Sequence, residues 1–534
     1  MLNPPIISPQ TIANPMGGAW LIQNFQLSLA YPLYVVSRLG SRRESHQREG
    51  FSEEVYQSSQ YDTASLSTIT FHLRFHLSHE VVHYELLAKV FGLIEPSVLE
   101  TWLGDEPTGQ YARRCGFLYE WFTGNLLVLP MRDGKSRIGG NYVDAIDANQ
   151  LVACSAEYAI KNTRWRINDN LAGTPDFCPM VVKTARLATA FTLDIAQMIQ
   201  QLTDTFGEDL LMRSSVWITL RESKASFTIE GEGKHTKRIE RFAQVMATQL
   251  GEGDIPLDNP SLTALQQAIL GDSVAIHQFG LRQSPVFVGQ VSQRDFKPIV
   301  HYIAPPFEQV AAMLAGLRRF IEVTQGQSAV MRCAVVAFAF VYIHPLADGN
   351  GRIHRFLMND MLRRDGVLPT SMILPISQVI NDTAKDRKAY DQILDSVSKP
   401  LMAQLKGQYA FGEMTTYADG IRSNLNLDDS HQAYPIWRYL DLTPHIGYMA
   451  DILRRVIKED LTEQSRYLLN HDKARVAIKD VVEMPNDYAD TIIRSVLDNL
   501  DSNDPSQKLV KAMPFLADTA VWRAIRDAVV QNLT

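Results

Sequence analysis

Cysteine is scarce in this chain. The 534 residues include four cysteines, and none of them belongs to a C-x-x-C pair: Cys115, Cys154, Cys178 and Cys333. A disulfide framework or a structural zinc site needs cysteines at paired spacings, so this usage argues against both. We expect reduced thiols that pack in a hydrophobic core.

Long uninterrupted apolar runs are also missing. A membrane-spanning helix needs about 18 consecutive apolar residues, and the longest run here, just before His344, is shorter. Residues 1–13 do not have the basic segment followed by an apolar one that marks a secretory signal. The sequence therefore predicts a soluble, cytoplasmic protein that has no membrane partner.

The chain has no excess of basic residues. Its 52 Lys and Arg stand against 59 Asp and Glu, and the resulting net charge of −7 gives no general attraction to nucleic acid. Internal repeats and low-complexity tracts are absent. At 534 residues, 46% hydrophobic and 21% charged, the sequence is that of a globular protein with several domains.

The most informative stretch is H-P-L-A-D-G-N-G-R-I-H-R, which occupies residues 344–355. Apolar residues precede it and recur at helical spacing after it, so the pattern predicts a helix end, a tight loop and a second helix. Gly349, Asn350 and Gly351 tolerate unusual backbone angles and let a ligand approach the backbone closely. Backbone N–H groups at a helix start or in a turn favour an anion.

The charged side chains of this stretch suit phosphate chemistry. Arg352 and Arg355 are three residues apart and can face one surface, where guanidinium groups bind phosphate oxygens in pairs. Asp348 can hold Mg²⁺ that also contacts phosphates. His344 has an unperturbed pKa that suits proton transfer near neutral pH. Together these residues indicate phosphoryl-type chemistry.

The stretch resembles the motif of the Fic family, H-x-F-x-(D/E)-G-N-G-R-x-x-R. Seven positions match: His344, Asp348, Gly349, Asn350, Gly351, Arg352 and Arg355. Leu346 replaces the usual Phe, at a position that serves packing. The resemblance implies a protein adenylyltransferase that moves AMP from ATP to a Ser, Thr or Tyr hydroxyl of a target protein. It implies His344 as the base and Asp348 as the Mg²⁺ ligand, and it places the other five residues at the phosphates of the nucleotide.

A second segment, Ser226-x-x-x-Glu230-Gly231, lies upstream of the motif. By its residues alone it is an ordinary helix end, with a solvated Glu230 and with Gly231 as the C-cap. Beside a Fic motif it resembles the inhibitory motif of the family, (S/T)-x-x-x-E-(G/N). That resemblance implies that Glu230 pairs with Arg355 and takes the guanidinium that would hold the γ-phosphate of ATP. The α-phosphate would then lie in a geometry that blocks in-line attack.

The fold class that these patterns predict is mainly α, in three parts. Residues 1–214 form a mixed α/β extension, in which 40–54 is charged and loop-like. Residues 215–400 form a helical Fic core with the inhibitory helix and a short β-hairpin flap near 282–302. By the resemblance, this flap would align a target segment as an edge strand. Residues 401–534 form a helical module, either a winged-helix relative or a packing unit.

Several alternatives stay open at this stage. Another nucleotide donor such as UTP, or removal of AMP by water, would use the same motif. Phosphotransferase members of the family have Lys at the position of Gly351, so that activity is disfavoured here. A non-catalytic, nucleotide-sensing regulatory protein would keep the phosphate cradle but would not need His344 and Asp348. Self-modification and a homodimer are also left open.

Overall fold

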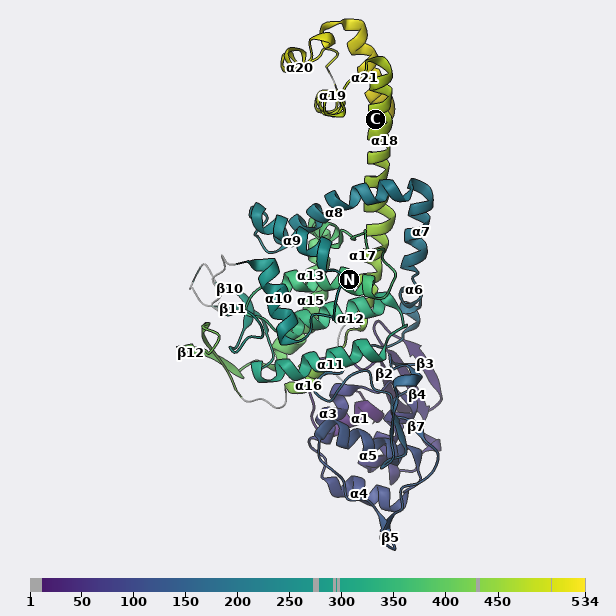
Figure 1. Ribbon diagram of the computed structural model, residues 1–534. Helices are drawn as coiled ribbons and strands as arrows, with labels where there is room; N and C mark the ends of the chain where they lie inside the picture. The colour runs from purple at the N-terminus through teal and green to yellow at the C-terminus, as the bar shows by residue number, and fades with distance from the viewer. Residues whose placement is uncertain are drawn as a thin grey trace.

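The computed structural model describes residues 12–271, 278–291, 294, 298–428, 433–500 and 502–533. Residues 1–11, most of the segment that lacks a secretory signal pattern, lie outside the described residues. Helices dominate the chain, which confirms the predicted fold class. Figure 1 shows an N-terminal part in purple and blue, a central helical part, and a small yellow C-terminal unit at the end of a long helix.

The N-terminal part packs helices against a four-stranded sheet of order β1-β2-β4-β3, in which β2 and β4 run parallel. The strands are β1 (Pro15–Met16), β2 (Val35–Gly40), β3 (Glu44–Gln47) and β4 (Ser52–Gln57). The helices are α1 (Gly17–Asn24), α2 (Ile69–His79), α3 (Tyr84–Phe91), α4 (Pro96–Asp105) and α5 (Gln110–Thr123). Shorter strands follow at β5 (Met131–Arg132), β6 (Lys135–Ser136), β7 (Val143–Asp144), β8 (Ile160–Asn162) and β9 (Ile167–Asp169).

The loop expected over residues 40–54 is wrong, because β3 and the start of β4 lie there. Their charged side chains pair with one another across the exposed surface of the sheet. Glu53 pairs with Arg38 and Arg48, and Glu54 pairs with Arg43. Charges that are matched across strands are compatible with an exposed strand surface, although they resemble a loop when the sequence is taken alone.

The central part is built around α12 (Ala329–Ile343), in which every residue from Val330 to Phe340 is buried. This is the apolar run that leads into the motif, so the run forms a core helix. Around it lie α8 (Glu208–Ile229), α9 (Thr236–Gln249), α10 (Asn259–Leu270), α11 (Val310–Val323), α13 (Asn350–Arg364), α14 (Ile376–Ile380) and α15 (Ala384–Gln404). Two shorter helices, α6 (Ala188–Phe191) and α7 (Ile195–Phe206), connect the N-terminal part to α8. All four cysteines are free and buried, as expected.

Two β-hairpins lie on one side of this core (Figure 1). The antiparallel pair β10 (Phe287–Val291) and β11 (Pro298–Ile303) confirms the predicted hairpin. A second antiparallel pair, β12 (Tyr409–Thr416) and β13 (Arg422–Leu427), was not predicted. The hairpins touch through Phe287 and Phe411, whose ring centroids are 5.3 Å apart.

The chain then returns to the core through α16 (Tyr434–Arg438) and α17 (Thr443–Arg455). A π-helical turn at 456–461 leads into α18 (Thr462–Val481), which carries the chain away from the core (Figure 1). Its far end packs with α19 (Asn486–Asp498), α20 (Gln507–Ala512) and α21 (Thr519–Leu533) around a separate hydrophobic cluster. The domain boundaries at 214/215 and 400/401 stay predictions.

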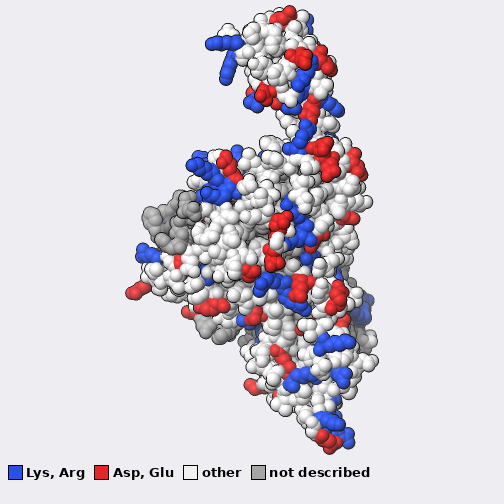
Figure 2. Space-filling view, viewed as in Figure 1, with Lys and Arg blue, Asp and Glu red and all other residues white. Residues whose placement is uncertain are grey.

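Two observations concern the surface and the membrane. Over most of the face in Figure 2, acidic and basic side chains are interspersed, so this face has no broad basic surface. None of the helices in the described ranges is long and apolar enough to cross a membrane.

Candidate functional site

Residues 344–349 form the loop between α12 and α13. Helix α12 ends at Ile343. His344 is its C-cap, with a φ of +50° in the left-handed region, and Gly349 precedes α13 with a φ of +91°. Asn350 closes the loop, since its side-chain oxygen accepts from the Leu346 N–H (3.0 Å) and its amide donates to the Leu346 carbonyl (2.7 Å). Leu346 is fully buried, as expected of a packing position. The Asn350 amide therefore holds the loop in shape.

The start of α13 presents backbone N–H groups that have no hydrogen-bond partner within the helix. The first N–H groups of a helix have no partner within it, and here they include those of Gly351 and Arg352. An added Cβ at Gly351 would overlap the Glu230 carboxylate, so glycine allows close approach at this point. This end of α13 is suited to bind an anion.

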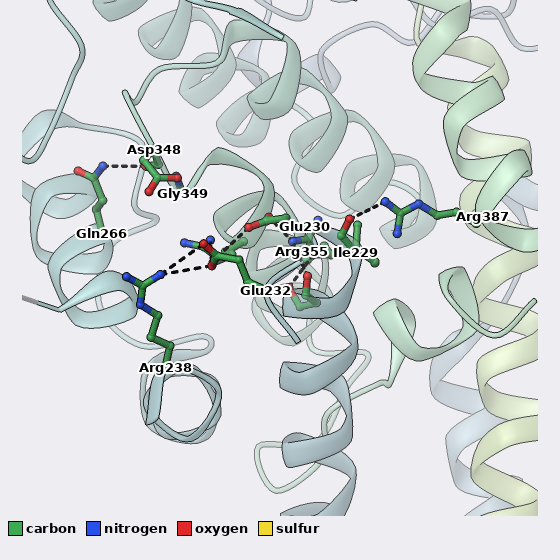
Figure 3. Close-up of polar contacts among 11 residues, drawn as sticks. Ile229, Glu230, Glu232, Arg238, Gln266, Asp348, Gly349, Arg355 and Arg387 are labelled. Atoms are coloured by element: carbon green, nitrogen blue, oxygen red, sulfur yellow. Dashed lines mark hydrogen bonds and ion pairs between the residues drawn. The ribbon is translucent and has the colours of Figure 1, made fainter. Parts of the chain in front are cut away.

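Asp348 offers one free carboxylate oxygen. Its Oδ1 accepts from the Gly349 N–H (2.6 Å), and Gln266 of α10 donates to its backbone carbonyl at 2.8 Å (Figure 3). Among the described residues, Oδ2 has no hydrogen-bond or ion-pair partner. The described residues contain no cluster of three or more His, Cys, Asp or Glu side chains that could bind a metal ion. Asp348 therefore fits a hard cation such as Mg²⁺ whose other ligands come from phosphate and water.

The His344 imidazole is neutral at physiological pH. Burial of the ring and the nearby Arg282 guanidinium lower its pKa from 6.5 to about 4. Its Nδ1 lies 3.3 Å from the Val341 carbonyl oxygen. An Nδ1–H directed there leaves Nε2 as the atom that can accept a proton.

The end of α8 has a defined geometry that places Glu230. Gly231 has φ +78°, and its N–H donates to the Thr228 carbonyl at 3.0 Å. The Glu232 N–H donates to the Phe227 carbonyl at 2.8 Å. This pair of bonds is the Schellman motif, so Gly231 is the helix terminator that the sequence indicated.

Glu230 bridges Arg352 and Arg355, two arginines of α13; the contact with Arg355 can be followed in Figure 3. Its Oε1 pairs with Nη2 of Arg355, and its Oε2 lies 2.8 Å from Nε of Arg352. Ser226 accepts from Arg355 twice, through its hydroxyl (2.6 Å from Nε) and its carbonyl (3.1 Å from Nη2). Both guanidinium groups are buried. The structure thus contains the expected Glu230–Arg355 pair and extends it to Arg352.

Glu232 is a second carboxylate at these arginines, and the sequence did not point to it. Its Oε2 lies 2.6 Å from Nη2 of Arg352, and its Oε1 lies 3.3 Å from Nη1 of Arg238 on α9. The Phe227 ring lies 4.7 Å from the Arg352 guanidinium carbon. The two acids that flank Gly231 were the signal that could have revealed this contact.

Another carboxylate, that of Glu222 within α8, holds the helix against α14. It is fully buried and accepts from the N–H groups of Ser377 (2.7 Å) and Gln378 (3.3 Å) at the start of α14. Burial raises its pKa from 4.5 to about 7, against the opposing effect of these hydrogen bonds and of Arg355. The sequence carried no signal for this contact.

Residues 256–362 match the model of the Fic/DOC family. They are a Fic domain. The match contains residues 344–355 and both strands of the first hairpin, whereas residues 226–232 lie outside it.

Two named proteins and one solved structure are similar to parts of this chain. Protein adenylyltransferase fic-1 of Caenorhabditis briggsae is 30% identical over 138 residues, 26% of this chain and 24% of that protein. Protein adenylyltransferase Fic of Drosophila mojavensis is 30% identical over 144 residues, 27% of this chain and 28% of that protein. A crystal structure of a Fic family protein from Desulfovibrio desulfuricans G20 aligns with 66% of this chain and 92% of its own, at 18% identity and a TM-score of 0.37. The chain thus spans about a quarter of the length of these two adenylyltransferases.

Proposed function

We propose that this protein is an autoinhibited protein adenylyltransferase, which moves AMP from ATP to a Ser, Thr or Tyr hydroxyl of a target protein. The observation that carries the proposal is the combination of groups around the start of α13. Free helix N–H groups, two buried guanidinium groups, a carboxylate with a free oxygen and a neutral imidazole lie around one loop. The similarity of the Fic domain to proteins named as adenylyltransferases supports it.

In this proposal His344 is the general base. Its Nε2 accepts the proton of the target hydroxyl while that oxygen attacks the α-phosphorus of ATP. The new bond joins the target oxygen to the α-phosphorus, and the bond from that phosphorus to the bridging oxygen breaks. Pyrophosphate leaves and AMP stays on the target. A neutral imidazole suits this role because it can accept a proton directly.

The phosphates are bound by the start of α13 and its arginines. The backbone around Gly349, Asn350 and Gly351 approaches them closely, Arg352 contacts the β-phosphate, and Arg355 contacts the γ-phosphate. Asp348 is the residue that would hold Mg²⁺. When bound, this ion neutralises charge that builds on the phosphates during transfer.

Autoinhibition follows from the competition of two anions for the same arginines. Glu230 and Glu232 already neutralise Arg352, and Glu230 and Ser226 occupy Arg355. Gly231 ends α8 so that both carboxylates point at α13. ATP can place its β- and γ-phosphates productively only after these side chains leave.

The experiment that tests the proposal is labelling with α-³²P-ATP and Mg²⁺, with the chain itself and a cell lysate as acceptors. It compares the wild type, Glu230→Gly, and Glu230→Gly combined with His344→Ala. We expect weak label with the wild type, strong label with Glu230→Gly, and none after His344→Ala. Parallel reactions with α-³²P-UTP measure the base preference. Absence of label from every variant on every acceptor contradicts the proposal and favours the nucleotide-sensing alternative.

A further inference from the structure

Arg282 is a buried arginine beside the motif loop. It is only 2% exposed, and its guanidinium has no ion-pair partner among the described residues. Instead, Nε donates to the carbonyl of His344 at 2.8 Å, Nη1 to that of Ser284 at 2.9 Å, and Nη2 to that of Pro305. Its own backbone N–H donates to the Pro345 carbonyl at 2.9 Å. One side chain thus donates hydrogen bonds to three separate backbone segments.

The positions of these carbonyls matter for the site. Ser284 lies just before β10 and Pro305 just after β11, so two of the hydrogen bonds hold the two ends of the first hairpin. The third holds the backbone of His344, a residue in the left-handed region. The planar fork of arginine reaches all three carbonyls at once, which a lysine ammonium cannot do.

Asp419 supports the same segment from the second hairpin. It lies in the turn between β12 and β13 and is 3% exposed. Its Oδ2 accepts from the Gln283 N–H (2.7 Å) and from the Ser284 hydroxyl (2.8 Å). Asp419 also lies beyond residues 256–362, the range that matches the Fic/DOC family. A part of the chain outside the matched domain therefore holds the segment that carries Arg282.

We propose that Arg282 is a positioning residue for His344 and that Asp419 of the second hairpin keeps Arg282 in place. Arg282 fixes the His344 backbone relative to the ends of the first hairpin, and so sets the distance from the imidazole to a target segment aligned there. This inference rests on the proposed function. Neither residue contacts Arg352, Arg355 or Asp348 in the described structure. The expected effect is therefore on catalysis and not on ATP binding.

The charge of Arg282 has a separate effect on His344. Arg282 is the charged group that lowers the pKa of the imidazole, in addition to burial. The ionisable groups that act on Arg282 itself are Tyr302, Glu308 and Asp419. Removal of the Arg282 charge therefore raises the pKa of His344, whereas a lysine keeps most of the charge. Geometry and charge can thus be tested with two different substitutions.

The test uses the full chain with Glu230→Gly as the active parent, and measures AMP transfer as a function of ATP and of pH. Arg282→Lys removes the fork and keeps the charge, so kcat falls by about 10-fold or more while KM for ATP is unchanged, as expected for a misplaced catalytic group. Arg282→Gln removes both, so kcat falls and the acid limb of the pH profile moves to higher pH. The matched control is Arg332→Lys. Arg332 is equally buried, lies at the other end of α12, and contacts the Ile321 carbonyl and Asp365.

The outcomes separate this inference from the proposed function. A parent that transfers no AMP contradicts the proposed function and this inference with it. An active parent whose kcat falls no further with Arg282→Lys than with Arg332→Lys overturns the positioning role alone. If the Arg282 variants do not fold, Asp419→Asn decides, because it removes one charge at a hairpin turn. A folded Asp419→Asn whose kcat falls by about 3-fold or more, at unchanged KM, supports the inference, and an unchanged kcat overturns it.

Discussion

At the residue scale, the proposed function rests on competition between protein carboxylates and ATP phosphates for the guanidinium groups of Arg352 and Arg355. Ser226 contacts Arg355 twice and Glu230 contacts it once, and the carboxylates of Glu230 and Glu232 contact Arg352. Charge-assisted contacts of this kind are strong where the partners are buried. The carboxylates are only partly buried, with side chains 25% and 30% exposed, so a phosphate can reach the arginines and compete.

The contribution of Glu232 can be measured with Glu232→Gln. We expect labelling slightly above that of the wild type, because Glu230 still holds Arg355. Combined with Glu230→Gly, it gives faster labelling than Glu230→Gly alone, because Arg352 then loses both carboxylates. Initial rates with α-³²P-ATP measure this. Glu240→Gln, at an exposed position of α9, is the matched control. A double variant no faster than Glu230→Gly rules out a role for Glu232.

A substitution at Gly351 is a second test of the competition between Glu230 and phosphate for Arg355. Its added Cβ would overlap Oε1 of Glu230, so Gly351→Ala displaces the carboxylate from Arg355. We expect the rate increase produced by Glu230→Gly to be smaller when Gly351→Ala is already present. The comparison of initial labelling rates in the four combinations isolates this effect from any direct cost to phosphate binding. An unchanged increase shows that Glu230 keeps its position beside the methyl group.

At the element scale, α8 is held at both ends of the face that leads to Glu230. Glu222, Ser226 and Glu230 are spaced four residues apart and share one face of the helix. Glu222 binds the start of α14, and Arg387 of α15 donates to the Ile229 carbonyl at the last residue of α8 (Figure 3). Release of Glu230 therefore requires either a local change at the end of α8 or movement of the whole helix.

The burial of Glu222 predicts a pH dependence of stability. Because the folded state raises its pKa from 4.5 to about 7, the folded state binds the proton more tightly than the unfolded state does. The contribution of Glu222 to stability therefore falls as pH rises from about 4.5 to about 7, by up to about 3 kcal/mol, and is level above that range. Urea unfolding of the wild type and Glu222→Gln at several pH values measures the difference. Asp169, whose pKa is raised to about 6, is present in both proteins, so its effect cancels when the two stability curves are subtracted. A constant difference between the two curves contradicts the prediction.

At the scale of the whole molecule, the candidate site and the C-terminal unit belong to separate hydrophobic cores. The site is built on the core around α12, whereas α19, α20, α21 and the far end of α18 pack around Trp522 and its neighbours. Helix α18 joins the two (Figure 1). A change in one core is therefore expected to leave the other intact.

This separation predicts the effect of Trp522→Ala. Trp522 is 4% exposed in the C-terminal cluster, so its truncation destabilises that unit by about 3–5 kcal/mol. Hydrogen exchange over α19 and α21 increases, while labelling by Glu230→Gly is unchanged. Phe356→Ala in the central core, within the helix that follows the motif loop, is the contrasting variant: it lowers labelling and leaves hydrogen exchange over α19 and α21 unchanged. Loss of labelling with Trp522→Ala alone indicates coupling between the two cores.

Much of the phosphate site could be predicted because its residues lie in one continuous stretch. Helical spacing already determines that Arg352 and Arg355 face one surface, and the glycines mark the tight loop before them. The pairing of Glu230 with Arg355 was predictable only through the family resemblance, since 125 residues separate the two. The second hairpin was missed because β12 is largely exposed and lacks the apolar alternation of a half-buried strand.

The sequence by itself determined the local chemistry of this protein: a tight loop between two helices, an anion-binding helix start, a carboxylate and a base. Only the tertiary structure decided which distant groups act on that chemistry. Glu222, Arg282 and Asp419 carry no local pattern, because an isolated charged residue is usually solvated. Glu232 had a local signal, the pair of acids around Gly231, but its partner Arg352 lies 120 residues away. Their positions result from the packing of α8, α14 and the two hairpins around α12 and α13, which brings segments more than a hundred residues apart into hydrogen-bonding distance.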